Sequence, residues 1–165
     1  MEKRGYLHHT KYLRLSTYVQ RDLRRFNLLI EKPKSIILDI GSGPCYFGFI
    51  GMLQGHRVTC MDIHEPLYDF LSALLGVRKL YQAVEKQQVL KNIRQSDYIT
   101  AFDICFGVGW NSFDWEFFLK DVKTHLKPRG QLILLPNCAD PCRTFLVSRC
   151  SSYKKSFLIF EKGDL

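Results

Sequence analysis

Long hydrophobic runs are absent from this sequence. No apolar stretch approaches the roughly 20 residues that a membrane-spanning helix needs, so we expect no membrane span. The N-terminal residues, MEKRGYLHHTKYLR, also lack the apolar core of a secretory signal peptide. These two absences make a cytoplasmic location the default expectation.

Metal-binding spacing is also missing, although the chain contains six cysteines. Structural zinc sites commonly carry paired cysteines in a C-x-x-C arrangement, often with histidines close by. Cys138 and Cys142 do not have this spacing, and no histidine lies near them in the sequence. Cys60 and Cys105 lie in apolar segments, where free cysteine behaves as a small hydrophobic residue. We therefore expect reduced cysteines and no metal site.

The chain shows no internal repeat, no low-complexity tract and no interdomain linker. Its 165 residues, of which 46% are hydrophobic, suit a single folded domain. Charge is unevenly spread: residues 1–34 hold nine Lys and Arg against three acids, residues 35–142 ten against eleven, and residues 143–165 five against two. Basic ends of this kind suit phosphate-bearing substrates, nucleic acid or a membrane surface, but they equally suit a solvated helix face.

The most informative stretch is residues 35–62, SIILDIGSGPCYFGFIGMLQGHRVTCMD. Its first apolar run ends at Asp39, and a glycine turn follows from Gly41 to Gly43. A helix-length apolar segment comes next, and a second apolar run ends at Asp62. A strand, a glycine turn, a helix and a strand with a terminal acid form half of a nucleoside-binding crevice.

The third glycine of the dinucleotide-binding pattern G-x-G-x-x-G is lacking, because Tyr46 stands in its place. That glycine permits close packing of the helix on the strand. A dinucleotide pyrophosphate would also lie at the helix N-terminus, where the Asp39 carboxylate would repel it. S-adenosylmethionine has no phosphate and carries a sulfonium and an ammonium group, which nearby carboxylates suit. The loop therefore favours S-adenosylmethionine over NAD.

These residues resemble the class I S-adenosylmethionine-dependent methyltransferases. The first motif of that family is an apolar strand, an acid and G-x-G-x-G; residues 38–44 match it, with Cys45 where the family often has a third glycine. Asp62 matches the family's second acid, which hydrogen-bonds the ribose hydroxyls. Residues 102–107 resemble the family's fourth strand, and residues 126–134 resemble the turn into the fifth. The resemblance implies a methyltransferase with S-adenosylmethionine as its cofactor.

The implied fold is α/β: a doubly wound, mostly parallel, seven-stranded Rossmann-like sheet in a minimal single domain. We expect a basic N-terminal segment at residues 1–34, a cofactor-binding core at 35–136 and closing strands at 137–165. An amphipathic helix is predicted over residues 11–30, with an apolar stripe at Tyr12, Leu15, Val19, Leu23, Phe26 and Ile30. Further helices are predicted at 46–54, 66–75, 85–93 and 115–125, and strands at 35–40, 57–61, 80–84, 103–107, 131–135, 144–149 and 156–161.

Ligands of open α/β sheets bind outside the carboxyl ends of the strands. The expected cofactor-binding residues are therefore Asp39, Gly41, Ser42, Gly43, Asp62, Ile63 and Gly107. Asp62 can accept two hydrogen bonds from a ribose diol, although capping the next helix is an alternative role for it. Asp103 is expected at the start of a strand, in a structural role. For the adenine amino group the sequence offers Gln82, Glu85 or the backbone.

The methyl acceptor and the catalytic base stay open. Candidates at the mouth of the cleft are Trp110 and Asn111, together with His8, His9 or Tyr6 of the N-terminal segment. A histidine pair is more often part of an ordinary polar segment than a catalytic base. Because the chain has no inserted substrate domain, we expect the acceptor site to be covered by residues 1–34, by residues 137–155 or by a second subunit. Our hypothesis is that residues 1–15 close over the bound cofactor. A small or medium-sized acceptor is the leading interpretation. An RNA-directed methyltransferase and a non-catalytic S-adenosylmethionine-binding or interaction module are the alternatives. The Asn-Pro-Pro-aromatic pattern of amino-directed nucleic-acid methyltransferases is absent, which disfavours nucleobase N-methylation.

Overall fold

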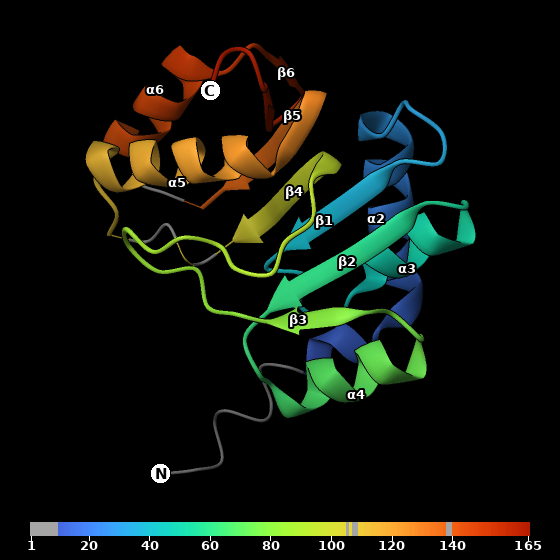
Figure 1. Cartoon of the computed structure of the whole chain (residues 1–165). Coiled ribbons are helices and arrows are strands. Elements are labelled where there is room, and N and C mark those ends of the chain that lie inside the picture. Colours follow the sequence, from blue (N-terminus) through green and yellow to red (C-terminus); the bar gives the residue numbers. More distant parts are fainter. Residues whose placement is uncertain (1–9, 105, 107–108, 138–139) are drawn as a thin grey trace, which may run out of the picture.

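One seven-stranded sheet forms the centre of the computed structural model, which describes residues 10–104, 106, 109–137 and 140–165 (Figure 1). The strand order is β3-β2-β1-β4-β5-β7-β6. The strands are β1 (Ile36–Ile40), β2 (Arg57–Asp62), β3 (Lys79–Tyr81), β4 (Ser96–Ile104), β5 (Leu126–Pro136), β6 (Ser152–Lys154) and β7 (Phe157–Glu161). β3, β2, β1, β4 and β5 pair in parallel, whereas β7 runs antiparallel to both β5 and β6. The sheet is therefore mixed, which corrects the expectation of a mostly parallel sheet.

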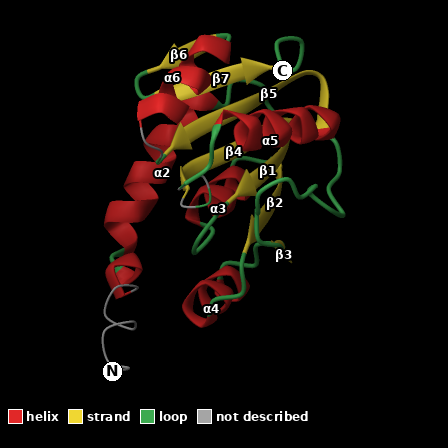
Figure 2. Cartoon of the chain, turned by 90° about the vertical axis from the view of Figure 1, so that its left-hand side faces the viewer, coloured by secondary structure: helices red, strands yellow, loops and turns green. Residues whose placement is uncertain are grey.

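Helices lie on both faces of this sheet (Figures 1 and 2). α2 (Leu15–Leu29) and α3 (Tyr46–Leu53) cover one face, and α5 (Ser112–His125) and α6 (Asp140–Arg149) cover the other. The short 3-10 helix η1 (Thr10–Leu13) precedes α2, and α4 (Pro66–Leu74) lies beside the β3 edge. None of the helices in the described part of the chain combines the length and apolar character needed to cross a bilayer.

Alternation along the strands divides the core into two layers. Ile37 of β1 and Ile133 of β5 face α2 and α3, where Phe26 and Phe47 are buried. Their neighbours Leu38, Leu132 and Leu134 face α5 instead, with Trp115 and Phe118. Successive strand residues point to opposite faces, so both faces of the central strands are apolar, as a sheet buried between helices requires.

Two predicted elements are wrong, and the fourth strand is present with other bounds. Residues 144–149, predicted as a strand, belong to α6, and the closing hairpin pairs β6 with β7. Residues 85–93, predicted as a helix, form turns and loop. The fourth strand begins at Ser96, well before the predicted residue 103. The sequence did not indicate that this polar start is buried, because the partners of Asp97 lie far away in the chain. Its carboxylate accepts hydrogen bonds from the backbone N–H of Ile36 at 2.8 Å and from the ammonium of Lys127 at 2.9 Å.

The packing face of α2 also differs from the predicted stripe. Leu15 and Leu23 are 52% and 40% exposed, whereas Phe26 and Leu29 are buried. Asp22 is buried beside them, which a purely apolar stripe does not allow for. Its carboxylate accepts hydrogen bonds from Arg21 at 2.7 Å and Arg25 at 3.3 Å. A buried carboxylate needs such partners, so charge pairing sets the orientation of the helix together with apolar contact.

Two glycines of α3 bring this helix close to the sheet. A Cβ atom on Gly48 would lie 2.4 Å from the sulfur of Cys60, and one on Gly51 would lie 2.8 Å from a methyl of Val58. The close helix–strand packing that a dinucleotide-binding turn obtains from its third glycine is thus provided here by glycines further along the helix. Tyr46, at the position of that third glycine, instead directs its hydroxyl to the backbone carbonyl of Tyr12, at 2.7 Å.

Candidate functional site

A cleft of about 410 Å³ opens at the carboxyl ends of β1, β2, β3 and β4. The segments that follow these strands line it, together with η1 and the start of α4. Open α/β sheets bind their ligands at this edge. The lining residues are Tyr12, Gly41, Gly43, Asp62, Ile63, Glu65, Tyr68, Gln82, Ala83, Val84, Asp103, Ile104 and Phe106.

The glycine loop is held against the end of β2. The backbone N–H groups of Gly41 and Ser42 donate to the carbonyl of Met61, at 2.8 and 3.2 Å. Gly41 and Gly43 have φ angles of 68° and 53°, a left-handed conformation that glycine adopts without a steric penalty. Cys45, where the family often has glycine, takes the same conformation with φ 64°. The loop therefore keeps the left-handed geometry at Cys45 even though a side chain replaces hydrogen there.

Asp62, the last residue of β2, is hydrogen-bonded to the glycine loop that follows β1. Its carboxylate accepts the N–H of Gly43 at 2.6 Å on one oxygen and the N–H of Ile63 at 2.7 Å on the other. A carboxylate offers about four lone-pair sites, so each oxygen keeps acceptor capacity toward the cleft. The side chain therefore has two free acceptor positions, fixed by the backbone, at the point where the sequence predicts a ribose diol.

Asp39 lies behind the loop and does not line the large cleft. Burial raises the pKa of its carboxyl to about 7, although the hydroxyl of Thr100 donates to it at 2.7 Å. It borders a separate pocket of about 40 Å³ together with Ser42, Arg21 and Arg25. Contact of Asp39 and Ser42 with the cofactor stays a prediction. A ligand would reach these two side chains through this small pocket.

Carboxylates dominate the charge of the cleft. Asp62, Glu65 and Asp103 line it, and its described lining contains no Lys, Arg or His. Asp103 lies near the end of β4, which corrects its predicted place at the start of that strand, and it pairs with Arg25 of α2 at 2.6 Å. A cleft with this charge suits a cationic ligand and would repel a pyrophosphate.

Tyrosines close one side of the cleft, and the sequence did not single them out. Tyr12 of η1 meets Tyr68 of α4 edge-to-face, with ring centroids 5.3 Å apart, and both line the cleft. Burial and a hydrogen bond with Tyr12 raise the pKa of Tyr68 well above its ordinary value, so this phenol stays protonated. Tyr12 was assigned to the apolar stripe of a helix; only the break between η1 and α2 turns it toward the cleft.

Of the two side chains proposed for the adenine amino group, Gln82 lies at the cleft and Glu85 does not. Gln82 lines the cleft, but its amide is engaged in the loop after β3. It donates to the carbonyl of Val89 at 3.0 Å and accepts from the N–H of Lys91 at 2.9 Å. Glu85 is exposed, does not line the cleft, and accepts a hydrogen bond from Gln88 at 2.7 Å. Residues 82–84 line the cleft, and contact of their backbone with the adenine stays a prediction.

Of the catalytic candidates, the structure describes Trp110 and Asn111, and neither contributes to the cleft. Tyr6, His8 and His9, and the predicted cofactor-binding residue Gly107, lie outside the described residues. Trp110 is buried against Trp115, with ring centroids 5.1 Å apart. Asn111 caps α5, and its side-chain oxygen accepts the N–H groups of residues 113 and 114.

Solved structures of methyltransferases share the fold of this chain. A TehB-like S-adenosylmethionine-dependent methyltransferase from Corynebacterium glutamicum superposes with a TM-score of 0.60 at 18% identity, covering 78% of this chain and 72% of that one. The chain has the class I methyltransferase fold. The glycopeptide N-methyltransferase MtfA, solved in complex with S-adenosylmethionine, shares this methyltransferase fold with a TM-score of 0.55 at 13% identity, over 68% of this chain and 52% of that one.

Comparison of sequences finds a distantly similar protein. A tRNA U34 carboxymethyltransferase from Ruthia magnifica subsp. Calyptogena magnifica is 29% identical over 102 residues, which cover 60% of this chain. The match spans 31% of that relative, or about a third of its length. No protein-family profile matches the chain.

Proposed function

We propose that this chain is an S-adenosylmethionine-dependent methyltransferase that acts on a small or medium-sized acceptor. The observation that carries the proposal is the position of Asp62, tied to Gly43 and open to a cleft at the carboxyl ends of a methyltransferase-type sheet. The fold alone does not determine the activity, so the argument rests on the residues of the site.

The residues of the cleft fit this cofactor. Asp62 would accept the ribose hydroxyls, and Ile63 would pack against the adenine. The backbone of Gly41 and Gly43 lies next to Asp62 and leaves room for the methionine part of the ligand, because neither residue has a side chain. The acidic lining suits the ammonium and sulfonium groups. The same lining argues against NAD, which was the least favoured cofactor on sequence grounds.

The chain's own contribution to methyl transfer is alignment and exclusion of water. S-adenosylmethionine supplies an electrophilic methyl group on its sulfonium. Tyr12 and Tyr68 close the cleft from one side, and Phe106 lies on its lining. Holding two reactants in line supplies a large part of the rate of such transfers. Tyr68 is protonated and suits a donor or packing role, so a general base, where the acceptor needs one, must come from elsewhere.

An RNA-directed methyltransferase is the second candidate. The tRNA relative favours it, and so does a groove of about 490 Å³ between α2 and the C-terminal hairpin. Its lining includes Arg21, Arg24, Arg25 and Lys155. Arg21 and Arg25 also border the small pocket beside Gly41, so this basic groove runs toward the glycine loop. A phosphate backbone in the groove would bring a nucleotide near the cofactor.

Transfer of tritium from methyl-labelled S-adenosylmethionine separates these candidates. The purified chain would be offered a small-metabolite extract and a total tRNA pool, each over a series of salt concentrations. Small-molecule transfer should be insensitive to salt, whereas RNA transfer should fall steeply as salt rises. The double variant R24E/K155E should lose RNA transfer and keep small-molecule transfer. Binding of S-adenosylhomocysteine without label transfer to either pool would favour the non-catalytic module instead.

A further inference from the structure

Part of one face of the sheet, over β1, β2 and β3, has no helix of the described residues covering it (Figure 1). The connection between β3 and β4, residues 82–95, contains no helix, and it crosses in front of the strands as a loop (Figure 1). Parallel sheets normally have both faces covered by helices. On the face that carries α5, the β1–β3 part of the sheet has only this loop over it, and Ile36, Leu80 and Ile93 are left half-buried.

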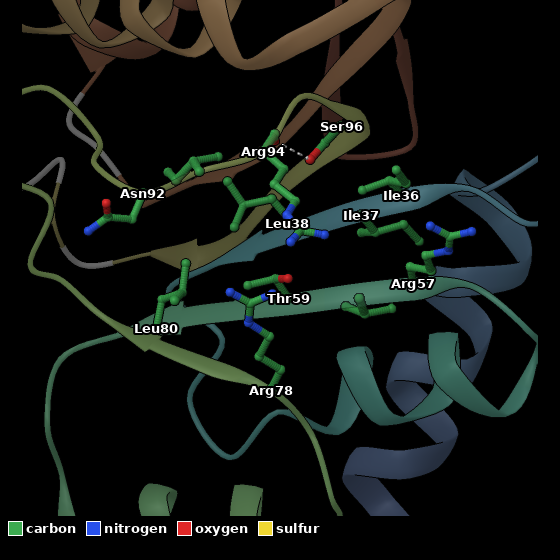
Figure 3. A pocket seen from close by; sticks show the side chains of 12 residues that line it. Ile36, Ile37, Leu38, Arg57, Thr59, Arg78, Leu80, Asn92, Arg94 and Ser96 are labelled. Carbon is green, nitrogen blue, oxygen red and sulfur yellow. Dashed lines mark hydrogen bonds between the residues drawn. The ribbon is translucent and has the colours of Figure 1, made fainter.

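The gap in the helical layer is a groove of about 240 Å³. It runs over the first residues of β1, β2 and β3, at the end of the strands opposite to the cofactor cleft, and the two share no lining residue. The floor is aliphatic, with Leu38 and Leu80 flanking Thr59 (Figure 3). The lining is completed by Ile36, Ile37, Arg57, Val58, Arg78, Asn92, Ile93, Arg94 and Ser96.

Arginines give this groove an uncompensated positive charge. Arg78 and Arg94 extend over its middle from opposite sides, and Arg57 lies at one end (Figure 3). Within the described part of the chain, none of the three guanidinium groups takes part in an ion pair or a side-chain hydrogen bond. Among the described residues that line the groove there is no Asp or Glu. Guanidinium groups bind carboxylates in a bidentate geometry, so the groove is complementary to carboxylates set beside apolar side chains.

We propose that this groove docks an acidic amphipathic helix of a partner protein. Such a helix would lie over this part of the sheet, with its apolar stripe on the half-buried Ile36, Leu80 and Ile93. Its Asp or Glu side chains would lie against Arg78 and Arg94. Helix-in-groove recognition uses apolar anchors at i, i+3, i+4 and i+7, which suits an aliphatic floor flanked by charge.

Two other occupants fit less well. A second copy of this chain would place the same arginines opposite one another, on a protein whose net charge is already +8. Single-stranded RNA would match the charge, but it is usually held by stacking of bases on aromatic rings. The described lining of the groove contains no aromatic residue, and an aliphatic floor provides no such platform.

A displayed library of 16-residue amphipathic helices tests this proposal. Each helix carries leucine at the anchor positions and Glu, Gln or Lys in varied combination at the flanking positions. Selection on the full chain should enrich Glu at the flanks, and selection on the variant R78E/R94E should enrich Lys. The enriched Glu peptide should bind R78E/R94E about tenfold or more weakly than it binds the unaltered chain. The control R129E/R143E changes the net charge equally at exposed sites outside the groove and should bind the peptide as before.

Hydrogen exchange would locate the peptide, with added protection expected at residues 36–38, 57–59 and 78–80. Enrichment of neutral or basic flanks, or binding that is unchanged in R78E/R94E, would overturn the proposal. Binding of a tRNA probe that R78E/R94E alone abolishes would assign the groove to nucleic acid. A concentration-dependent dimer lost only in that variant would assign it to a second copy. S-adenosylhomocysteine binding by R78E/R94E should be unchanged, so this result is separable from the methyltransferase proposal.

Discussion

The carboxylate of Asp62 accepts a hydrogen bond from the backbone N–H of Gly43 at 2.6 Å. This contact links the end of β2 to the glycine loop that follows β1. The loop therefore takes its place relative to the second strand through the same side chain that faces the cleft. Removing this carboxylate should alter both the geometry of the loop and the acceptors that the cleft offers to a ligand.

The first prediction concerns closure of the cleft by the N-terminal segment. Replacing Tyr12 by alanine removes a ring that lines the cleft and packs on Tyr68, so S-adenosylhomocysteine should bind about fivefold to tenfold more weakly. The exposed Tyr153 provides a control, since Tyr153→Ala should leave the affinity unchanged. A chain that begins at residue 16 should show at least the loss seen for Tyr12→Ala. Full affinity and full methyl transfer by that shortened chain would refute closure by residues 1–15.

The second prediction concerns the glycine that brings α3 close to β2. Gly48→Ala places a methyl group 2.4 Å from the sulfur of Cys60, and such overpacking typically costs about 1–3 kcal/mol. The loss should appear in urea unfolding even though alanine is the better helix former. Gly163→Ala, where no atom lies within 4 Å, should change the free energy of unfolding little. Adding Cys60→Ala to Gly48→Ala should recover part of the loss; no loss in the single variant would show that the helix is not held this closely.

The third prediction concerns the start of β4. Asp97 accepts the N–H of Ile36 and the ammonium groups of Lys32 and Lys127, and despite its burial these contacts hold the pKa of its carboxyl well below the ordinary range. Asp97→Asn should lower the free energy of unfolding by about 2 kcal/mol at pH 7.

The pH dependence of this contribution has a defined sign. Below about pH 4 the unfolded carboxyl binds a proton that the folded one does not, so the stability from Asp97 is lost as pH falls. Urea titrations at pH 3 and pH 7 should show a smaller pH effect in Asp97→Asn than in the unaltered chain. Equal pH effects in the two proteins would contradict the role assigned to Asp97.

The fourth prediction concerns Asp39, whose contribution to stability should change with pH in the direction opposite to that of Asp97. Burial raises the pKa of Asp39 to about 7, so between about pH 4 and pH 7 the folded protein binds a proton that the unfolded chain lacks. The contribution of Asp39 to stability should therefore fall as pH rises through this window, by up to about 1.4 kcal/mol per pH unit. Asp39→Asn keeps an acceptor for the hydroxyl of Thr100 and should remove this slope. A slope that persists in the variant would assign it to another group.

Local patterns were enough to predict the glycine turn and the position of Asp62 beside it. The glycines of the turn identify a segment that needs left-handed backbone. Asp62 was recognised because it directly follows an apolar run, so both features are visible in short stretches of the sequence. The first, second and fifth strands were predicted from their apolar runs, and the structure contains all three.

Distant contacts explain what the sequence did not predict. The buried start of β4 depends on contacts of Asp97 with Ile36 and Lys127, which lie far away in the chain. Residues 144–149 contain strand-favouring side chains, but packing against α5 holds them in α6. Tyr12 and Tyr68 meet only after η1 and α4 are placed, and no local pattern brings two such residues together. Tertiary contacts therefore overrode local preference at each of these points.

Calorimetric titration of the full chain with S-adenosylhomocysteine and, separately, with NADH would determine which cofactor the cleft binds. We expect saturable binding of S-adenosylhomocysteine with a Kd on the order of micromolar, and no response to NADH. Asp62→Ala should weaken S-adenosylhomocysteine binding by about tenfold or more, because a charged acceptor is lost, whereas Glu116→Gln on α5, outside the cleft, should not. Tight binding of NADH with no response to S-adenosylhomocysteine would contradict the account.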